Sequence, residues 1–487
     1  MHSGLITADA KAQVYARPVG GEAEVFFACA YGPRHTYNLG TTLPGVTAQA
    51  KTFSAPVRLP GDFNEWRFAV NDRGEAVGVL PSGKHVVVAQ LARSGRIRHS
   101  WLLPLPGHVA ETSLVSIALS EGGDVAIGVL YSDGQRTPGG GGPAHGESGC
   151  CDHIAIATWQ LGKRPPEAQA VSPELSPVTA LGGQPLHAPV MVVGRSDVTA
   201  LWIRGNESPY VQAADQIEEA FGPVGRPLRT ARLPAVPGAV SFLDLHLAHD
   251  GRPIASWIDD GDIIRTVTGL RSGALRSPLR FQRIPGYGSG VGFSHDNEGH
   301  TVFAYLSGPP KGTQRLVTIT STNGGRFRNA RVIASIPANS SIPSLYAGGR
   351  GSLLAIWAHT RQNDLPKQFE ALRGSVLGGF ARPVQLGVLP FPESEPESAG
   401  FLDSHGQALI IQPRRAAHRS HSYELVALTA QSDRPFERPR PIASRLLDCG
   451  IDEEALAASL NGHAVLVVTC KEGSGQRGSQ YLIRYTP

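Results

Sequence analysis

Residues Phe68–Leu80 read FAVNDRGEAVGVL and set the pattern for most of the chain. Two runs of alternating apolar residues flank a short polar turn that Gly74 closes. Alternation with a period of two is typical of half-buried strands, and two such runs around a turn predict a β-hairpin. The pattern recurs in seven further units, among them Phe242–Trp257, Val291–Tyr305 and Ser344–Trp357. The chain is therefore a repeat of hairpins.

The spacing of the turns is that of propeller blades. From Gly251 onward, successive turn glycines are 48, 52, 55 and 56 residues apart, a period typical of one four-stranded blade. The longer interval between Gly123 and Ser196 contains a Gly-rich insertion at residues 132–153, in the second blade. We predict an all-β fold, an eight-bladed β-propeller, with seven blades as the alternative. The turn glycines are Gly74, Gly123, Gly251, Gly299, Gly351, Gly406 and Gly462.

A fainter repeat marks the outer strands. Phe380–Leu386 (FARPVQL) and Phe436–Ile442 (FERPRPI) each follow a unit, and an outer strand tolerates proline. Phe53–Leu59 (FSAPVRL) has the same pattern but no unit before it, whereas the last unit ends at Ser479–Thr486 without an outer strand. We predict that this N-terminal strand completes the last blade and closes the ring, which removes exposed sheet edges.

The repeats predict one propeller domain that is preceded by an N-terminal extension. Residues 1–50 form an N-terminal extension with a β-hairpin packed on the ring, because Val25–Tyr31 (VFFACAY) is too apolar to remain in water. Residues 51–487 form a single β-propeller domain. The one stretch that favours two or three helical turns is Val211–Phe221 (VQAADQIEEAF), in the third blade.

Composition excludes several classes of protein. The 487 residues carry a net charge of +4, which over this size is no nucleic-acid footprint. No run of eighteen apolar residues exists, so we expect no membrane span. Residues 1–11 lack the apolar region of a signal peptide. We expect an extracellular or cell-surface monomer whose leader is absent from this numbering, with a cytoplasmic protein as the alternative, and no cofactor.

The five cysteines indicate the cellular compartment, through possible disulfides, and the possible metal sites. The last hairpin brings Cys449 and Cys470 near each other, so they are candidates for a disulfide that staples the closing blade, with two buried free thiols as the alternative. The insertion contains His145, Cys150, Cys151 and His153. Adjacent cysteines do not readily ligate one tetrahedral ion and no CxxC spacing is present, so we expect no metal site.

The loops between second and third strands carry the strongest functional signal. In a propeller these loops share one face, and from the fifth blade onward they are basic, whereas the fourth blade has Asp259–Asp262 (DDGD) in this place. A half-basic face suits an anionic ligand. The candidate binding residues are Lys311, Arg315, Arg361, Lys367, Arg414, Arg415, His418, Arg419 and Lys471.

Large aromatic residues recur in register at the end of the second strand in four consecutive units. They are Trp202, Trp257, Tyr305 and Trp357. Repetition in register predicts packing between blades, because a sugar platform does not need one ring in every blade.

The turns between third and fourth strands resemble the Asp-boxes of sialidase-type propellers. Ser321–Phe327 (STNGGRF) has Gly325 at the glycine of the box, Asn323 in place of its Asp, and Phe327 in place of its Trp, one residue early. The resemblance implies a propeller. Sialidases themselves have six blades, an arginine triad, a Tyr–Glu pair and an acid Asp, which this sequence does not match residue by residue.

Two functions remain after these exclusions. The first is a non-enzymatic, secreted or surface-associated binding propeller that engages an anionic glycan or a protein partner through the basic loops. The alternative is a carbohydrate-active enzyme, either a glycoside hydrolase or a polysaccharide lyase, that uses the same face. We identify no catalytic residues from the sequence, because the separation of its carboxylate pairs decides a glycosidase and cannot be read from sequence.

Overall fold

The computed structural model of the chain describes most of its strands and turns. The described residues are 15–19, 22–26, 53–59, 66–92, 94–132, 153–172, 189–204, 216–234, 240–259, 262–276, 280–284, 286–296, 298–309, 312–337, 340–341, 343–359, 367–389, 399–415, 423–431, 434–443, 450–459, 461–471 and 478–486.

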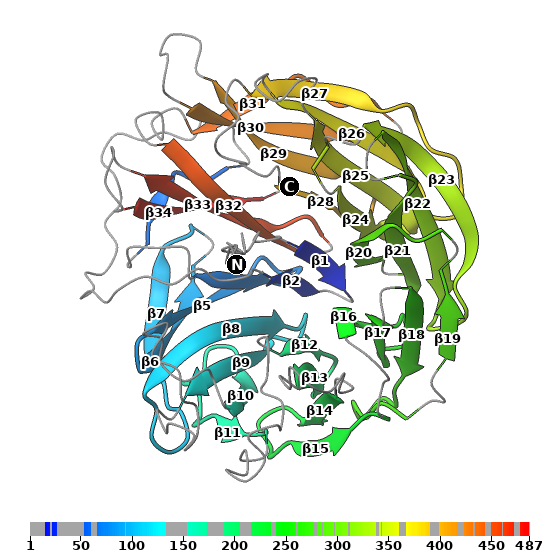
Figure 1. The fold of residues 1–487 in the computed structure, drawn as a ribbon. Coiled ribbons are helices and arrows are strands. Elements are labelled where there is room, and N and C mark those ends of the chain that lie inside the picture. Colours follow the sequence, from blue (N-terminus) through cyan, green and yellow to red (C-terminus); the bar gives the residue numbers. More distant parts are fainter. Residues whose placement is uncertain are drawn as a thin grey trace, which may run out of the picture.

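Eight four-stranded antiparallel sheets are arranged as the blades of a propeller (Figure 1). Each blade is a meander in which consecutive strands pair. In chain order, blade 1 contains β4 (Arg67–Val70), β5 (Ala76–Ser82), β6 (His85–Leu91) and β7 (Ile97–Leu103); blade 2 contains β8 (Glu111–Leu119), β9 (Asp124–Ser132), β10 (His153–Gln160) and β11 (Gln169–Ala170); blade 3 contains β12 (Val190–Val193), β13 (Asp197–Arg204), β14 (Gln216–Pro223) and β15 (Arg229–Arg232); and blade 4 contains β16 (Val240–Leu247), β17 (Pro253–Asp259), β18 (Ile263–Thr268) and β19 (Arg280–Arg283).

The second half of the ring repeats this order, and the last blade takes its outer strand from the N-terminal side of the chain. Blade 5 contains β20 (Ser289–His295), β21 (His300–Ser307), β22 (Thr313–Thr322) and β23 (Arg328–Pro337); blade 6 contains β24 (Ser344–Gly348), β25 (Ser352–His359), β26 (Lys367–Ser375) and β27 (Val384–Leu389); blade 7 contains β28 (Ala399–Leu402), β29 (Ala408–Arg415), β30 (Tyr423–Ala430) and β31 (Arg440–Ala443); and blade 8 contains β32 (Gly450–Ala458), β33 (Ala464–Lys471), β34 (Gly478–Tyr485) and β3 (Val57–Arg58).

The ring is closed by the predicted strand. Val57 and Arg58 of β3 pair with Leu482 and Tyr481 of β34, and the Leu59 N–H donates to the Gln480 carbonyl at 2.8 Å. The first strands of neighbouring blades lie innermost and contact one another all the way round, including β32 against β4. The predictions of eight blades and of closure by an N-terminal outer strand are therefore confirmed.

Seven of the eight tight turns that follow the first strands contain a glycine with a positive φ. In blade 1 the Asn71 side-chain oxygen accepts the N–H groups of Arg73 and Glu75 at 3.2 and 2.9 Å. Gly74 has a φ of 70°, a left-handed conformation that glycine adopts without steric cost. All seven predicted turn glycines have a positive φ. The same turn in blade 6 is the short 3₁₀ helix η1 (Gly349–Gly351).

The core consists of eight apolar clusters, each shared by two neighbouring blades. Trp202, Trp257, Tyr305 and Trp357 are at most 2% exposed and each lies in one of these clusters. The prediction that the repeated aromatic residues pack between blades is confirmed. Burial of this kind stabilises each blade only in the presence of its neighbours.

A two-stranded hairpin occupies the middle of the ring (Figure 1). Its strands are β1 (Tyr15–Val19) and β2 (Glu22–Phe26), paired in antiparallel register. β2 contacts β4 and β8 on one side of the ring, and β1 contacts β24 and β28 on another. The hairpin therefore lies among the innermost strands of several blades.

The helix predicted at Val211–Phe221 is wrong for its second half, because residues 216–223 form β14. In this strand Ile217 and Ala220 are fully buried in two different inter-blade clusters. Packing on both faces of the sheet thus overrides the local helical pattern. No helix among the described residues is long and apolar enough to cross a membrane.

Candidate functional site

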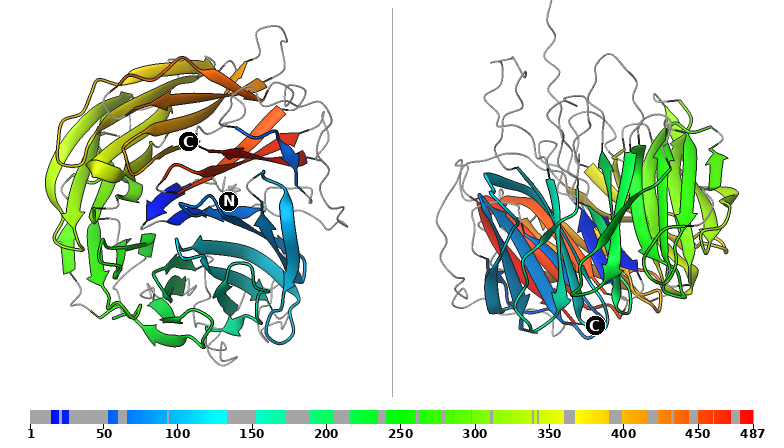
Figure 2. Two further views of the ribbon diagram at one scale, coloured as in Figure 1. Left: turned by 180° about the vertical axis from the view of Figure 1, so that it is seen from behind. Right: turned by 90° about the horizontal axis from the view of Figure 1, so that it is seen from below.

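The repeated meander gives the ring two faces of different character. All blades have their first strand innermost, so the connections between second and third strands leave from one face, which we call the loop face (Figure 2). The tight turns after the first strands lie on the opposite face, which we call the turn face. The strand ends that flank the predicted basic loops therefore share the loop face; these ends are Ser307 and Thr313, His359 and Lys367, Arg415 and Tyr423, and Lys471 and Gly478.

The described residues include part of the predicted basic set. Arg315 is exposed on β22, near its loop-face end. Arg414 lies on β29, where its side chain is 42% exposed. Lys367, Arg415 and Lys471 lie at the loop-face ends of β26, β29 and β33. The remaining predicted binding residues, Lys311, Arg361, His418 and Arg419, lie outside the described residues.

Arg414 has an acidic neighbour on the next strand. It stands opposite Glu424 in the antiparallel register of β29 and β30, and its Nε and Nη2 donate to Glu424 Oε1 at 2.8 and 2.5 Å. A half-exposed pair of this kind carries little net charge. Any ligand that binds Arg414 must therefore compete with the Glu424 carboxylate.

The acidic loop of blade 4 is charge-balanced at its two described carboxylates. Asp259 is fully buried and accepts from Arg265 Nε at 2.5 Å. Asp262 accepts from Arg283 Nε at 2.7 Å. The expectation of an acidic sector at this loop is thus wrong for these two residues, because each is neutralised by an arginine of its own blade.

Two glutamates have the raised pKa that often marks a catalytic acid. Burial raises the pKa of Glu219 to about 7, and it does the same for Glu121. Both are held by backbone N–H groups of a neighbouring blade: Leu275 donates to Glu219 at 3.1 Å and Asp72 donates to Glu121 at 2.8 Å. Contacts between blades therefore account for the burial and the raised pKa of Glu219 and Glu121.

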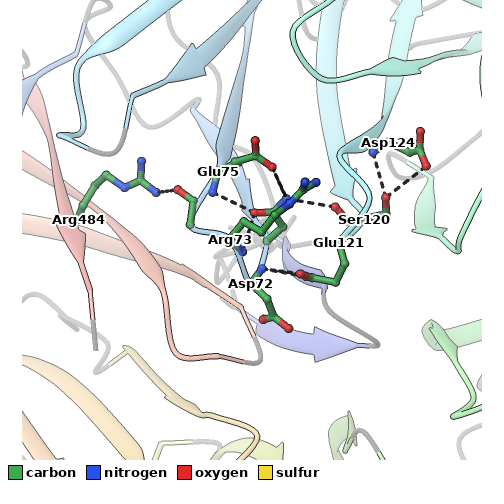
Figure 3. A network of polar contacts seen from close by, with 9 residues as sticks. Asp72, Arg73, Glu75, Ser120, Glu121, Asp124 and Arg484 are labelled. Atoms are coloured by element: carbon green, nitrogen blue, oxygen red, sulfur yellow. Dashed lines mark hydrogen bonds and ion pairs between the residues drawn. The ribbon is translucent and has the colours of Figure 1, made fainter.

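The surroundings of Glu121 show how the turn face holds blades together (Figure 3). The Asp72 N–H binds both Glu121 oxygens, and the Asp72 carboxylate accepts the N–H of Asn461 from blade 8 at 2.7 Å. Arg484, also in blade 8, donates to the carbonyl of Gly74. The turns of blades 8, 1 and 2 are therefore joined by hydrogen bonds, on the face opposite the basic loops.

One group of potential metal ligands on the turn face is explained by its turn. Asp296, Glu298 and His300 place ligand atoms within 4.8 Å of one another. Asp296 Oδ1 accepts the N–H groups of Glu298 and His300 at 2.9 and 2.8 Å, the arrangement that Asn71 and Asp403 make in their own blades. The repeated turn thus accounts for this group without a ligand.

A second group of such residues was missed from the sequence. Asp244 and His246 lie on β16, His295 lies on β20, and all three are buried. The available signal was the spacing of Asp244 and His246, two polar residues on one face of an inner strand. The contribution of His295 from the next blade required the fold.

The disulfide candidates and the Gly-rich insertion remain predictions. Cys470 lies in β33 opposite Ile451 of β32, and Cys449 lies outside the described residues, as do residues 133–152 of the insertion.

No protein-family model matches the chain, and no curated protein matches its sequence. Similar solved structures include the BP39L lectin from Burkholderia pseudomallei, with 10% identity and a TM-score of 0.43 over 76% of this chain and 95% of that one. The polysaccharide lyase Uly1 has 11% identity and a TM-score of 0.41, covering 84% of this chain and 88% of that one. Prolyl oligopeptidase B from Galerina marginata has 10% identity and a TM-score of 0.43, covering 84% and 56%. At these values the similarities carry no argument about function.

Proposed function

We propose that this protein is a non-enzymatic binding propeller, secreted or surface-associated, that engages an anionic glycan or an acidic protein surface through its loop face. The observation that supports the proposal is the common direction of four neighbouring hairpins, β21–β22, β25–β26, β29–β30 and β33–β34. All nine candidate residues lie in the sequence of their connections or within three residues of one.

Charge on adjacent blades suits an extended anion better than a small one. Guanidinium groups bind carboxylates and sulfates through paired N–H donors. Contacts spread over four blades add by multivalency, so each contact can be weak. Because exposed charges are screened by salt, binding of this kind should weaken steeply as ionic strength rises.

A screen of polysaccharides and proteoglycans tests the proposal directly. The full chain is applied to an array of sulfated, uronate-containing and neutral glycans at low salt and at about 0.5 M salt, where screening is strong. The same polysaccharides are incubated with the protein and assayed for new reducing ends and for unsaturated uronate. We expect salt-sensitive retention on anionic glycans or on an acidic protein, without product.

Other outcomes of the screen would reject parts of the proposal. Release of reducing ends would identify a hydrolase, and unsaturated uronate would identify a lyase. Binding confined to neutral glycans, or binding that does not respond to salt, would exclude the basic loops as the contact surface. Absence of binding to glycans and to acidic proteins at low salt would contradict the proposal as a whole.

A further inference from the structure

Two histidines and an aspartate meet between the inner strands of blades 4 and 5. Asp244 and His246 come from β16 and His295 from β20, and all three side chains are fully buried. Asp244 Oδ2 lies 3.3 Å from His246 Nδ1 and also contacts His295 Nε2. The two imidazole rings stack, with centroids 3.5 Å apart and an interplanar angle of 15°. One carboxylate oxygen therefore faces a ring nitrogen from each histidine.

The alternation of β16 explains why these side chains face blade 5. Leu245 and Leu247 pack toward blade 3, in the cluster that contains Val190 and Val192. Side chains alternate between the two faces of a strand, so Asp244 and His246 project to the other face. The inter-blade apolar cluster on that side has nine buried members, the fewest of the eight clusters among the described residues.

No other blade has a histidine at the position of His246. Aligned on the turns that follow the first strands, the equivalent residues are Ala69, Ala118, Val192, Ser294, Tyr346, Phe401 and Ala457. The propeller repeat does not require a polar residue at this position. The Asp–His–His group thus differs from Asp296, Glu298 and His300, which make hydrogen bonds that the turn of other blades also makes.

We propose that Asp244, His246 and His295 bind a divalent transition-metal ion, with Zn²⁺ the best match. Zinc is held by imidazole nitrogens and carboxylate oxygens at about 2.1 Å, which places the ligand atoms of a tetrahedral site about 3.4 Å apart. Asp244 Oδ2 and His246 Nδ1 are already separated by this distance, at 3.3 Å, whereas Asp244 Oδ2 and His295 Nε2 are in direct contact and must move apart to admit the ion. Two nitrogen ligands disfavour Ca²⁺ and Mg²⁺, which prefer oxygen.

The surroundings of His246 support this assignment. Its other ring nitrogen, Nε2, lies 3.0 Å from Thr301 Oγ1 on β21. Ligand histidines usually have the non-ligating nitrogen held by a hydrogen bond of this kind, which fixes the orientation of the ring. Here it leaves Nδ1 directed at Asp244. An ion bound between β16 and β20 would join blades 4 and 5, whose shared apolar cluster has the fewest buried members among the described residues.

The metal content of the untagged full chain tests the proposal. The protein is produced in zinc-supplemented medium, desalted and analysed for metals by mass spectrometry. We expect about one Zn²⁺ per chain, held by these three side chains with a water molecule in the fourth position. Refolding with Co²⁺ in place of zinc should give the visible absorption of tetrahedral cobalt, a readout that needs no variant.

Matched variants locate the ion. His295→Gln and His246→Gln should lose it. His300→Gln, five residues after His295 at the start of β21, should keep it, as should the double variant Cys150→Ser with Cys151→Ser. A chain without bound zinc and without the cobalt spectrum overturns the proposal. It is equally overturned if the cysteine variant loses the ion, or if folded His295→Gln retains it.

Discussion

At the scale of single residues, the sequence predicted buried polar side chains least well. Glu218 and Glu219 lie in the stretch predicted to be helical, where they would face solvent. In the sheet both are buried: Glu218 accepts from Trp202 Nε1 at 2.9 Å, and Glu219 accepts the N–H of Leu275. The pattern of one segment cannot reveal partners that come from other strands, which is why the prediction failed here.

The raised pKa of Glu219 predicts a specific dependence of stability on pH. Its ordinary value is 4.5 and burial raises it to about 7, so between these values the folded chain keeps a proton that the unfolded chain has lost. The contribution of this group to the free energy of unfolding therefore falls as pH rises from 4.5 to about 7. One pKa unit corresponds to about 1.4 kcal/mol, so the shift sets an upper bound of about 3.5 kcal/mol on this contribution.

Glu219→Gln removes this dependence while keeping an oxygen for the Leu275 N–H. Urea unfolding measured across the window should show the variant gaining stability relative to the natural chain as pH rises, and levelling off above about pH 7. Glu298→Gln, an exposed turn residue, controls for loss of one charge. Parallel pH curves for Glu219→Gln and the natural chain would show that Glu219 is not the group responsible.

At the scale of elements, the sequence predicted strands well because each carries its own alternation. The hairpins around Gly74 and Gly251 and the outer strand at residues 53–59 all lie in their predicted blades. The loops carry no such periodic constraint. Their charges indicated a face, but the neutralisation of Asp259 by Arg265 and the pairing of Arg414 with Glu424 depend on neighbours that only the folded sheet brings close.

Strand β3 should account for a large part of the stability of blade 8. Phe53, Val57 and Leu59 are all less than 9% exposed, and each buried side chain contributes about 1.5–3 kcal/mol. A chain that begins at residue 61 should therefore lose about 5 kcal/mol in urea unfolding relative to one that begins at residue 51. Both lack β1 and β2, so the comparison isolates β3.

The same truncation should also change the assembly state. Without β3, the edge of β34 is unpaired and offers its N–H and C=O groups to another chain. Sedimentation should show self-association for the chain beginning at residue 61 and a monomer for the chain beginning at residue 51. Equal stability and equal sedimentation of the two would contradict closure by this strand.

At the scale of the whole molecule, the repeat predicted the ring and the face on which binding is proposed. Glycine spacing predicted the number of blades, and the meander order places the strand ends that flank the basic loops on one face. The group formed by Asp244, His246 and His295 could not be anticipated in this way, since its members belong to two blades and depart from the repeat. The repeat pattern thus predicts the features that all blades share. It does not predict a site that occurs only at the interface between blades 4 and 5.

The most direct test of this account compares charge removal on the two faces. One variant combines Arg315→Ala, Arg361→Ala and Arg419→Ala, three of the residues predicted to bind, and leaves Arg414 with Glu424 in place. The control combines Arg326→Ala and Arg382→Ala, two exposed residues in the turns between third and fourth strands, which lie on the turn face. Both are titrated with the anionic ligand from the screen over a range of salt concentrations.

The account predicts that the loop-face variant binds at least about tenfold more weakly at low salt and loses most of the salt dependence, because the screened contacts are gone. The turn-face control should bind like the natural chain. Equal losses of affinity in both variants would show that binding depends only on net charge. Undiminished, salt-sensitive binding by the loop-face variant would contradict the assignment of the binding surface.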